Sequence, residues 1–258
     1  MLAVLLAGCA TTGTRTPGDP LEGMNRRVQR FNDAVDRAVL KPVARGYERH
    51  VPRVIRIGIG NVLGNLAFTT TIVNDFLQLK LVDTFADLGR FAINSTLGIG
   101  GLLDPATHIG IRHNEEDFGQ TLGRWGMPAG PYLVVPLIGP STLRDAPSLA
   151  ADAQTDLRVQ LDLEPEVQAG LAVLTVIDKR AELLPLDPAI DAAYDRYAFV
   201  RNAWLQRREY QVRDGDVPEE APLEEELEDP ADQPPEESSR PETPPIPASA
   251  DSAGGSFR

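Results

Sequence analysis

Residues 57–74 read IGIGNVLGNLAFTTTIVN, and none of these eighteen side chains carries a charge. Two further uncharged stretches follow, Phe91–Leu103 with thirteen residues and Trp125–Leu143 with nineteen. All three are too long and too free of charge for ordinary exposed helix faces. Polar residues, glycines and prolines interrupt them, so none is a conventional membrane-spanning segment. The stretches predict either a buried core or helices that lie against lipid with polar side chains turned toward an internal cavity.

A helix is expected in the segment before these stretches. It begins near Asp19-Pro20, with Asp as the capping residue and Pro at the first helical position. Apolar residues recur there every three or four positions, which places on one face Leu21, Met24, Val28, Phe31, Val35 and Val39. Lys41-Pro42 is expected to break or kink this helix, and Pro52 to mark the next boundary.

Two more helices are expected after the uncharged stretches. One opens at Pro165 and ends at Pro185, and its apolar positions are Val167, Leu171, Leu174 and Ile177. The other opens at Asp187-Pro188 and continues on one side with Ile190, Tyr194, Tyr197, Val200 and Trp204. Strand-like alternation is confined to a short hairpin around Tyr132–Val135. The predicted fold class is therefore all-α.

The N-terminal residues have the pattern of a lipoprotein precursor. A short apolar run ends in Leu6-Ala7-Gly8-Cys9, with small residues before the cysteine as lipoprotein processing requires. We expect residues 1–8 to be part of a signal peptide and Cys9 to carry a diacylglycerol and an N-acyl chain, with no other cofactor. Several acyl chains meet the requirement of two signals for stable anchoring. Residues 9–18 are small and polar and predict a tether.

The negative charge is concentrated at the C-terminal end. Residues 214–258 contain fourteen acidic residues and two arginines, a net charge of −12, whereas residues 1–213 carry a net charge of −1. Nine of the 22 prolines also lie in this tail. So little apolar surface predicts a disordered, acidic, proline-rich tail after a helical domain at residues 19–213. The chain has no basic stripe interleaved with aromatic residues, so we expect no nucleic-acid partner.

The sequence contains no pattern of catalytic or metal-binding residues. His108 and His113 stand near Glu115, Glu116 and Asp117, but their spacing matches no zinc motif, and we interpret the segment as a solvated charged loop. Gly-x-Ser-x-Gly, the nucleophile motif of esterases, is absent. Gly58-Ile59-Gly60 and Gly98-Ile99-Gly100-Gly101 lack the remainder of a phosphate-binding loop, and we expect these glycines to allow close helix approach or bending.

Motifs along residues 9–208 resemble the MlaA/VacJ family of outer-membrane lipoproteins. The resemblance opens with Asp19-Pro20-Leu21-Glu22-Gly23-Met24-Asn25-Arg26 and Lys41-Pro42-Val43-Ala44. It continues, in order and at suitable spacing, in VNDFLQ (73–78), RFAINSTLG (90–98), GGLLD (100–104), EDFGQTLG (116–123), GPY (130–132) and GPSTLRD (139–145).

The resemblance implies an all-α disc or ring of amphipathic helices around a central channel. Members of this family remove mislocalised phospholipid from the outer leaflet and pass it to a soluble periplasmic carrier, which maintains outer-membrane lipid asymmetry. They associate with trimeric porins and are not enzymes. Ala10 follows Cys9 in place of the aspartate of the inner-membrane retention signal, so we expect anchoring at the periplasmic face of the outer membrane.

The resemblance also suggests which side chains meet lipid. As a hypothesis, the channel or its rim contains Phe31, Asn32, Asn61, Asn65, Asn74, Asn94 and Ser95, most of which are polar but uncharged. Gly126, Pro128 and Gly130 lie in a segment similar to the family's glycine-rich loop near the channel. Pro128 stands where the family commonly has glycine, and it is expected to stiffen this loop by fixing φ near −65°.

Three functions are compatible with these observations. The first is a phospholipid-translocating lipoprotein that carries out no covalent chemistry. The second is a lipid-anchored scaffold that binds porins without carrying lipid. The third, a membrane-attached phospholipase, has the weakest basis because the nucleophile motif is absent.

Overall fold

The computed structural model describes residues 19–216. All described residues belong to one compact unit. The predicted signal peptide (1–8), the lipidation site Cys9, the tether and the acidic tail beyond Asp216 lie outside the described residues.

Helices dominate the described residues, which confirms the predicted fold class. The elements in chain order are α1 (Glu22–Val35), a π-helical turn η1 (Asp36–Leu40), α2 (Lys41–His50), α3 (Arg53–Leu77), α4 (Leu81–Thr96), α5 (Pro105–His108), α6 (Phe118–Arg124), β1 (Tyr132–Val135), β2 (Gly139–Thr142), α7 (Asp145–Asp152), α8 (Leu157–Gln160), α9 (Pro165–Leu183), a 3-10 turn η2 (Leu184–Leu186), α10 (Asp187–Ala192) and α11 (Arg196–Val212).

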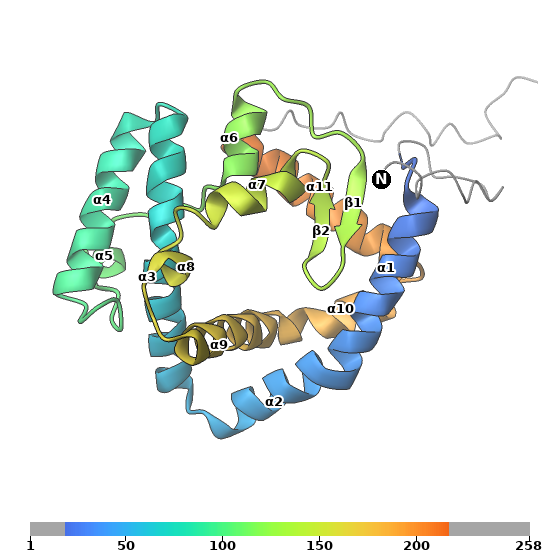
Figure 1. Cartoon of the computed structure of the whole chain (residues 1–258), viewed down its shortest axis with the longest axis horizontal. Helices are drawn as coiled ribbons and strands as arrows, with labels where there is room; N and C mark the ends of the chain where they lie inside the picture. The colour runs from blue at the N-terminus through green and yellow to red at the C-terminus, as the bar shows by residue number, and fades with distance from the viewer. Residues whose placement is uncertain (1–18, 217–258) are drawn as a thin grey trace, which may run out of the picture. The chain divides into compact units, whose positions relative to one another are not determined.

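Within residues 19–216 the elements close a ring (Figure 1). The continuous helical segment of α1, η1 and α2 leads into α3, which packs on α6. Helix α6 packs on α11, α11 contacts β2, and β1 contacts α1, so the circuit returns to its start. Helix α9 packs against both α2 and α3 along one side of this ring, and α4 pairs with α3 on its outside.

The only sheet of the described residues is the predicted hairpin. Strands β1 and β2 are antiparallel, with Tyr132 opposite Thr142 and Val135 opposite Gly139. Tyr132 and Val134 form a small apolar core with Tyr197 of α11, against which Val28 of α1 also packs. The hairpin is therefore the joint where the two ends of the ring meet.

The start of the first helix differs from the prediction. Helix α1 begins at Glu22, and Asp19 does not cap it. The Asp19 carboxylate is buried, accepts hydrogen bonds from the Tyr197 hydroxyl and from Asn25, and lies 3.3 Å from the Arg201 guanidinium. A long-range contact with α11 therefore takes the place of the predicted local cap.

The expected effects of two prolines are confirmed. The helix does not break at Pro42, but its hydrogen bonding changes to the π-helical turn η1 immediately before it, an irregularity of the kind that kinks helices. Pro52 separates α2 from α3, because Val51 adopts an extended conformation with ψ of 118°.

The two C-terminal helices are confirmed in part. Helix α9 spans Pro165–Leu183 as predicted. The helix predicted from Asp187, however, is two helices, because the chain leaves helical geometry at Ala193 and α11 restarts at Arg196. The Asp195 carboxylate caps α11 by accepting from the backbone N–H groups of Tyr197 and Ala198.

Burial in this structure is the reverse of that in an ordinary soluble helical protein. Eight apolar residues of the described part are buried, against twenty-four polar or charged ones. Helix α4 shows the pattern most clearly, because it buries Thr84, Asp87, Arg90 and Asn94 and exposes Leu81, Val82, Phe85 and Leu88. Within the uncharged stretches Leu63, Phe68, Tyr132 and Val134 are buried, whereas Ile57, Leu97, Ile99 and Trp125 are exposed, so the buried-core prediction holds only in part. Buried Asn65, Asn74 and Asn94 fit the alternative with polar side chains turned inward.

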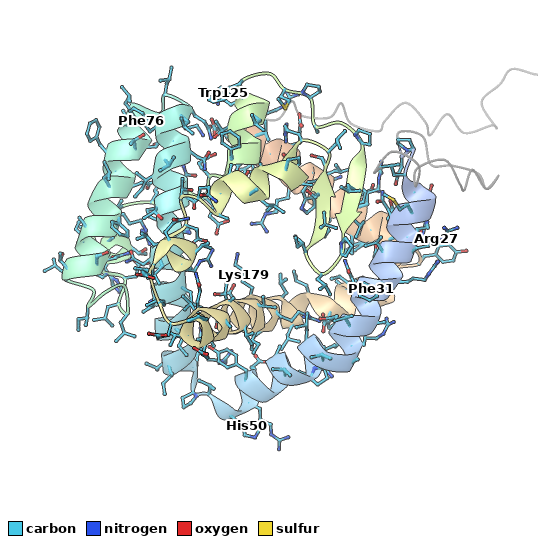
Figure 2. All side chains as sticks on the ribbon, in the orientation of Figure 1. Arg27, Phe31, His50, Phe76, Trp125 and Lys179 are labelled. Atoms are coloured by element: carbon cyan, nitrogen blue, oxygen red, sulfur yellow. The ribbon has the colours of Figure 1, made fainter. Side chains whose placement is uncertain are left out.

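Helix α4, whose exposed apolar residues include Val82 and Phe85, lies on the outside of the ring (Figure 1). Phe76 at the end of α3 is drawn on its outer edge, whereas Lys179 of α9 points toward its centre (Figure 2). Across residues 19–216, no helix combines the length and apolar character that crossing a bilayer requires.

Candidate functional site

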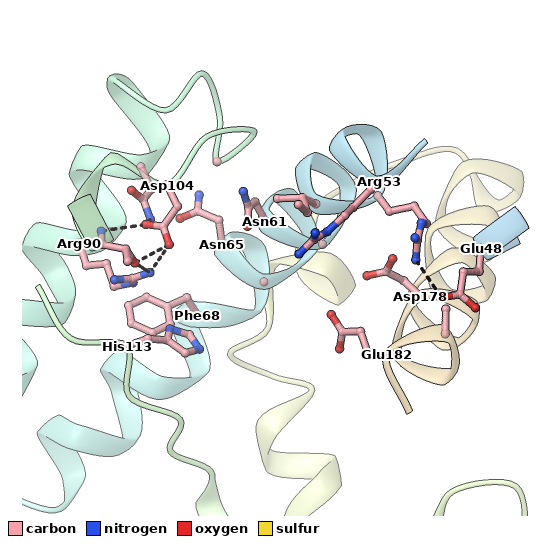
Figure 3. Close-up of a pocket in the computed structure, with 18 of the residues that line it drawn as sticks. Glu48, Arg53, Asn61, Asn65, Phe68, Arg90, Asp104, His113, Asp178 and Glu182 are labelled. Atoms are coloured by element: carbon pink, nitrogen blue, oxygen red, sulfur yellow. Dashed lines mark hydrogen bonds and ion pairs between the residues drawn. The ribbon is translucent and has the colours of Figure 1, made fainter. Parts of the chain in front are cut away.

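Two joined cavities run along α3 where it faces α9. The first has a volume of about 620 Å³ and the second of about 470 Å³. Both are lined by Gly60, Gly64, Phe68, His113, Asp178 and Glu182. Figure 3 shows the first cavity, with Arg90 and Asp104 at one end and Asp178 and Glu182 at the other.

Helix periodicity places the polar residues of α3 in the first cavity. Asn61, Asn65 and Phe68 are spaced by four and three residues and therefore share one helix face. Gly60 and Gly64 lie beside them, and a Cβ at Gly64 would meet no atom within 4 Å. Gly64 therefore leaves open space where the two cavities meet, whereas a Cβ at Gly60 would lie 3.2 Å from Asp178 Oδ2.

Asparagine side chains tie α3 to the last turn of α4 and to the segment that follows it. Asn65 Nδ2 donates to Ser95 Oγ at 2.9 Å, and Asn61 Nδ2 donates to the Leu102 carbonyl at 3.2 Å. Gly101 permits this contact, because a Cβ there would lie 2.6 Å from the Asn65 Cβ. The predicted role of this glycine segment in close approach is confirmed.

An ion pair closes one end of the first cavity. Arg90 Nη2 donates to Asp104 at 2.7 Å and to Thr107 at 2.9 Å, and Asn94 donates to the same carboxylate at 2.9 Å. Burial alone raises the pKa of Asp104, but the hydrogen bonds and the Arg90 charge outweigh it and hold the pKa at about 2. The carboxylate therefore stays ionised throughout the physiological pH range.

The segment that we interpreted as a solvated loop is an integral part of the wall. The His113 ring stacks on Phe68 with 5.4 Å between ring centroids, and His113 lines both cavities. Glu116 is buried and accepts hydrogen bonds from Gln78 and Lys80. The interpretation holds for His108, His113 and Glu115, which are exposed, and is wrong for Glu116 and Asp117, which pair with Lys80 and Arg208. Across residues 19–216, no group of three or more His, Cys, Asp or Glu side chains is arranged to hold a metal ion.

A pair of buried carboxyl groups lies behind the cavity wall, between α3 and α4. Asp75 and Asp87 are both fully buried and hydrogen-bonded to each other. Burial, the hydrogen bond and the Asp87 charge raise the pKa of Asp75 to about 8. The pair therefore holds a proton at neutral pH, which removes the repulsion between two adjacent carboxylates.

The structure brings some of the predicted site residues together. Asn61, Asn65 and Asn94 line the first cavity, and Ser95 contacts Asn65. Asn74 instead accepts a hydrogen bond from Thr121 and is 2% exposed, so it packs between helices.

The remaining predicted residues lie elsewhere. Phe31 is half exposed on α1, and Asn32 binds the hairpin by donating to the Val135 carbonyl at 3.0 Å. Gly126 and Pro128 line a third cavity of about 520 Å³, and Gly130 packs beside Leu143.

The sequence reasoning missed the charged residues of the first cavity. Arg53, Asp178 and Glu182 line it, and Asp178 is 7% exposed. A usable signal was present in the helix predicted from Pro165 to Pro185, because Asp178 directly follows Ile177 on its apolar side. A charge at that position indicates a polar partner or a cavity.

The fold and the cavities define a class of protein, one whose helices present apolar residues outward and enclose a polar interior. Comparison with known proteins gives the family. A profile of the MlaA lipoprotein family matches residues 17–211, and the chain belongs to this family.

Known relatives agree with this assignment. The intermembrane phospholipid transport system lipoprotein MlaA of Escherichia coli (strain K12) is 36% identical, over 84% of this chain and 89% of its own length. The protein of the same name from Haemophilus influenzae is 30% identical, over 84% of this chain and 90% of its own length. A solved structure described as the structural basis for maintenance of bacterial outer membrane lipid asymmetry matches with a TM-score of 0.68 at 35% identity, covering 77% of this chain and all of that one.

Proposed function

We propose that this protein removes mislocalised phospholipid from the outer leaflet of the outer membrane and hands it to a soluble periplasmic carrier. It works at the periplasmic face of that membrane, anchored by lipid on Cys9 and associated with a trimeric porin. The transport of phospholipid by named relatives supports the proposal. In this proposal, the joined cavities along α3 form the lipid channel.

The observation that carries the proposal is the reversed distribution of polar and apolar side chains. A phospholipid needs a path that accepts its charged headgroup, because an isolated charge is costly in an apolar medium. The polar cavities supply such a path. The exposed apolar side chains of α3 and α4 allow the outer surface of the ring to contact acyl chains.

The test is to narrow the joint between the two cavities. Gly64→Leu places a bulky side chain where no other atom lies within 4 Å, at a position that lines both cavities. The change should not unfold α3, because leucine favours a helix interior over glycine by about 1 kcal/mol. Gly170→Leu on α9 is the matched control, since it also meets open space but lines neither cavity.

Outer-leaflet phospholipid is measured in a deletion strain that carries each variant. Gly64→Leu is expected to leave it at the raised level of the deletion strain, whereas Gly170→Leu restores normal asymmetry. Full restoration by Gly64→Leu contradicts the proposed path. It also favours the scaffold alternative, in which porin binding alone suffices and both variants are active.

Two further measurements test the remaining parts of the proposal. Crosslinking of photoreactive phospholipid to Asn61 and Asn65 is expected for a lipid channel, and a scaffold should give no such adducts. Purified protein incubated with labelled phospholipid is expected to release no lysolipid, because transport breaks no covalent bond.

A further inference from the structure

Charged side chains in the first cavity divide into paired and unpaired groups. Arg90 pairs with Asp104 at 2.7 Å, and Arg56 lies 3.9 Å from Glu48. Three groups remain that have no ion pair with another described residue, namely Arg53 on α3 and Asp178 and Glu182 on α9. One cation and two carboxylates therefore face the same space from opposite walls.

Arg53 is placed to bind an anion. It is exposed in the first turn of α3, and no side chain caps the N-terminus of this helix. The helix dipole adds a partial positive charge at this end. Figure 3 shows the Arg53 side chain between Asn61 on one side and the two α9 carboxylates on the other.

Asp178 and Glu182 are placed to bind a cation. Asp178 is more than nine-tenths buried, and its Oδ1 accepts a hydrogen bond from the Tyr47 hydroxyl at 2.9 Å. Its Oδ2 has no partner among the described residues and lies 3.2 Å from the position of a Cβ at Gly60, a residue that lines the cavity. Glu182 follows one helical turn later, and burial and the Asp178 charge raise its pKa. The Lys179 charge opposes this shift, but its side chain points toward the centre of the ring, and a cation between the two carboxylates would relieve their repulsion directly.

We propose that the first cavity binds the headgroup of an aminophospholipid, with the phosphate at Arg53 and the primary ammonium at Asp178 and Glu182. This inference rests on the proposed function and names the lipid class that the channel prefers. A phospholipid whose headgroup is neutral or anionic beyond the phosphate gains the Arg53 contact only. The two carboxylates repel additional negative charge. The α9 carboxylates therefore determine which headgroup is preferred, and Arg53 of α3 contributes affinity for any phospholipid.

The experiment measures which lipid the full-length protein takes up. Protein purified in mild detergent is incubated with vesicles that hold equal amounts of ethanolamine and glycerol phospholipids. The protein is separated, and the ratio of the two bound lipids is measured by mass spectrometry. The unmodified protein is expected to bind the ethanolamine lipid in excess by about threefold, the size of a partly exposed charge interaction.

Variants separate the two roles. Glu182→Gln and Asp178→Asn should each bring the ratio close to one, and Asp178→Asn keeps an oxygen that accepts from Tyr47. Arg53→Ala should lower the amounts of both lipids and leave the ratio unchanged. Glu166→Gln is the control, an exposed carboxylate of α9 outside the cavity, and should change neither quantity.

Each remaining outcome is decisive. An unmodified protein that binds both lipids at equal ratio overturns this inference and leaves the proposed function intact. A protein that takes up neither lipid overturns both. Inorganic phosphate added to the same mixture should not displace the ethanolamine lipid. Complete displacement by phosphate shows that Arg53 is a site for the free anion and overturns the inference.

Discussion

Asp75 and Asp87 show how a single buried pair links this fold to pH. The unshifted pKa of Asp75 is 3.8, and in the folded protein burial, the contact with Asp87 and its charge raise the pKa to about 8. A raised pKa means that the folded state binds the proton more tightly than the unfolded state does. The contribution of Asp75 to stability is therefore complete below about pH 4 and is lost as the pH rises toward 8.

Asp75→Asn removes this titration and keeps a hydrogen-bonding side chain opposite Asp87. We expect the variant to have a higher free energy of unfolding than the unmodified protein at pH 8, and a smaller loss between pH 4 and pH 8. Urea unfolding in mild detergent at several pH values measures both quantities. Asp162→Asn, an exposed position, serves as control. A variant that is less stable than the unmodified protein at pH 8 contradicts the assignment of a shared proton.

At the scale of elements, glycine allows the close approach of α3 to the turn after α4. Gly101 has φ of +90°, and a Cβ there would lie 2.6 Å from the Asn65 Cβ. Gly100 has φ of +68°, but a Cβ there would meet nothing within 4 Å. Both glycines have a positive φ that side chains disfavour, but only at Gly101 would a Cβ also collide with a neighbouring residue.

Gly101→Ala and Gly100→Ala therefore separate the two effects. Both variants carry the cost of a left-handed alanine, about 1–2 kcal/mol. Gly101→Ala should lower the free energy of unfolding by a further 1–3 kcal/mol or so, because it must displace Asn65. Thermal unfolding of the two proteins side by side measures the difference. Equal losses of stability would show that α3 moves away from this turn freely.

Local signals in the sequence predicted many of these elements. Pro52, Pro165 and Pro185 bound helices as expected, because proline acts through its own backbone. The start of α1 and the interruption between α10 and α11 were not predictable in this way. Asp19 contacts Tyr197, and Asp195, which caps α11, pairs with Arg26 of α1, so residues far along the chain determine what these carboxylates do.

The site was predictable to a lesser extent than the fold. Asn61 and Asn65 stood out because polar residues interrupt an uncharged stretch, and both line the first cavity. Asp178 and Glu182 reach the same cavity from α9, and only the closed ring brings α9 against α3. Periodicity places a residue on a helix face but does not say what that face meets.

For the whole molecule, the reversed burial predicts which surface meets the membrane. Phe76, Leu79, Leu81, Val82, Phe85 and Leu88 form an exposed apolar patch at one end of α3 and α4, which we term the α3–α4 patch. Val82 is 83% exposed and Phe85 is 73% exposed, so neither contributes much to internal packing. Such a patch on a protein of this size marks a contact surface for lipid or protein.

A double variant, Val82→Asp with Phe85→Asp, tests this surface in protein whose Cys9 is replaced by Ala, so that the lipid anchor does not dominate. Transfer of each apolar side chain out of water is worth about 1.5–3 kcal/mol, so flotation with phospholipid vesicles should fall by at least about tenfold. The free energy of unfolding in detergent should change little, because both side chains are exposed. Tyr194→Asp, a fully exposed residue between α10 and α11, should float like the parent protein. Undiminished flotation of the double variant would mean that another part of the ring contacts the bilayer, and that the polar face of α4 is turned inward only to hold α3.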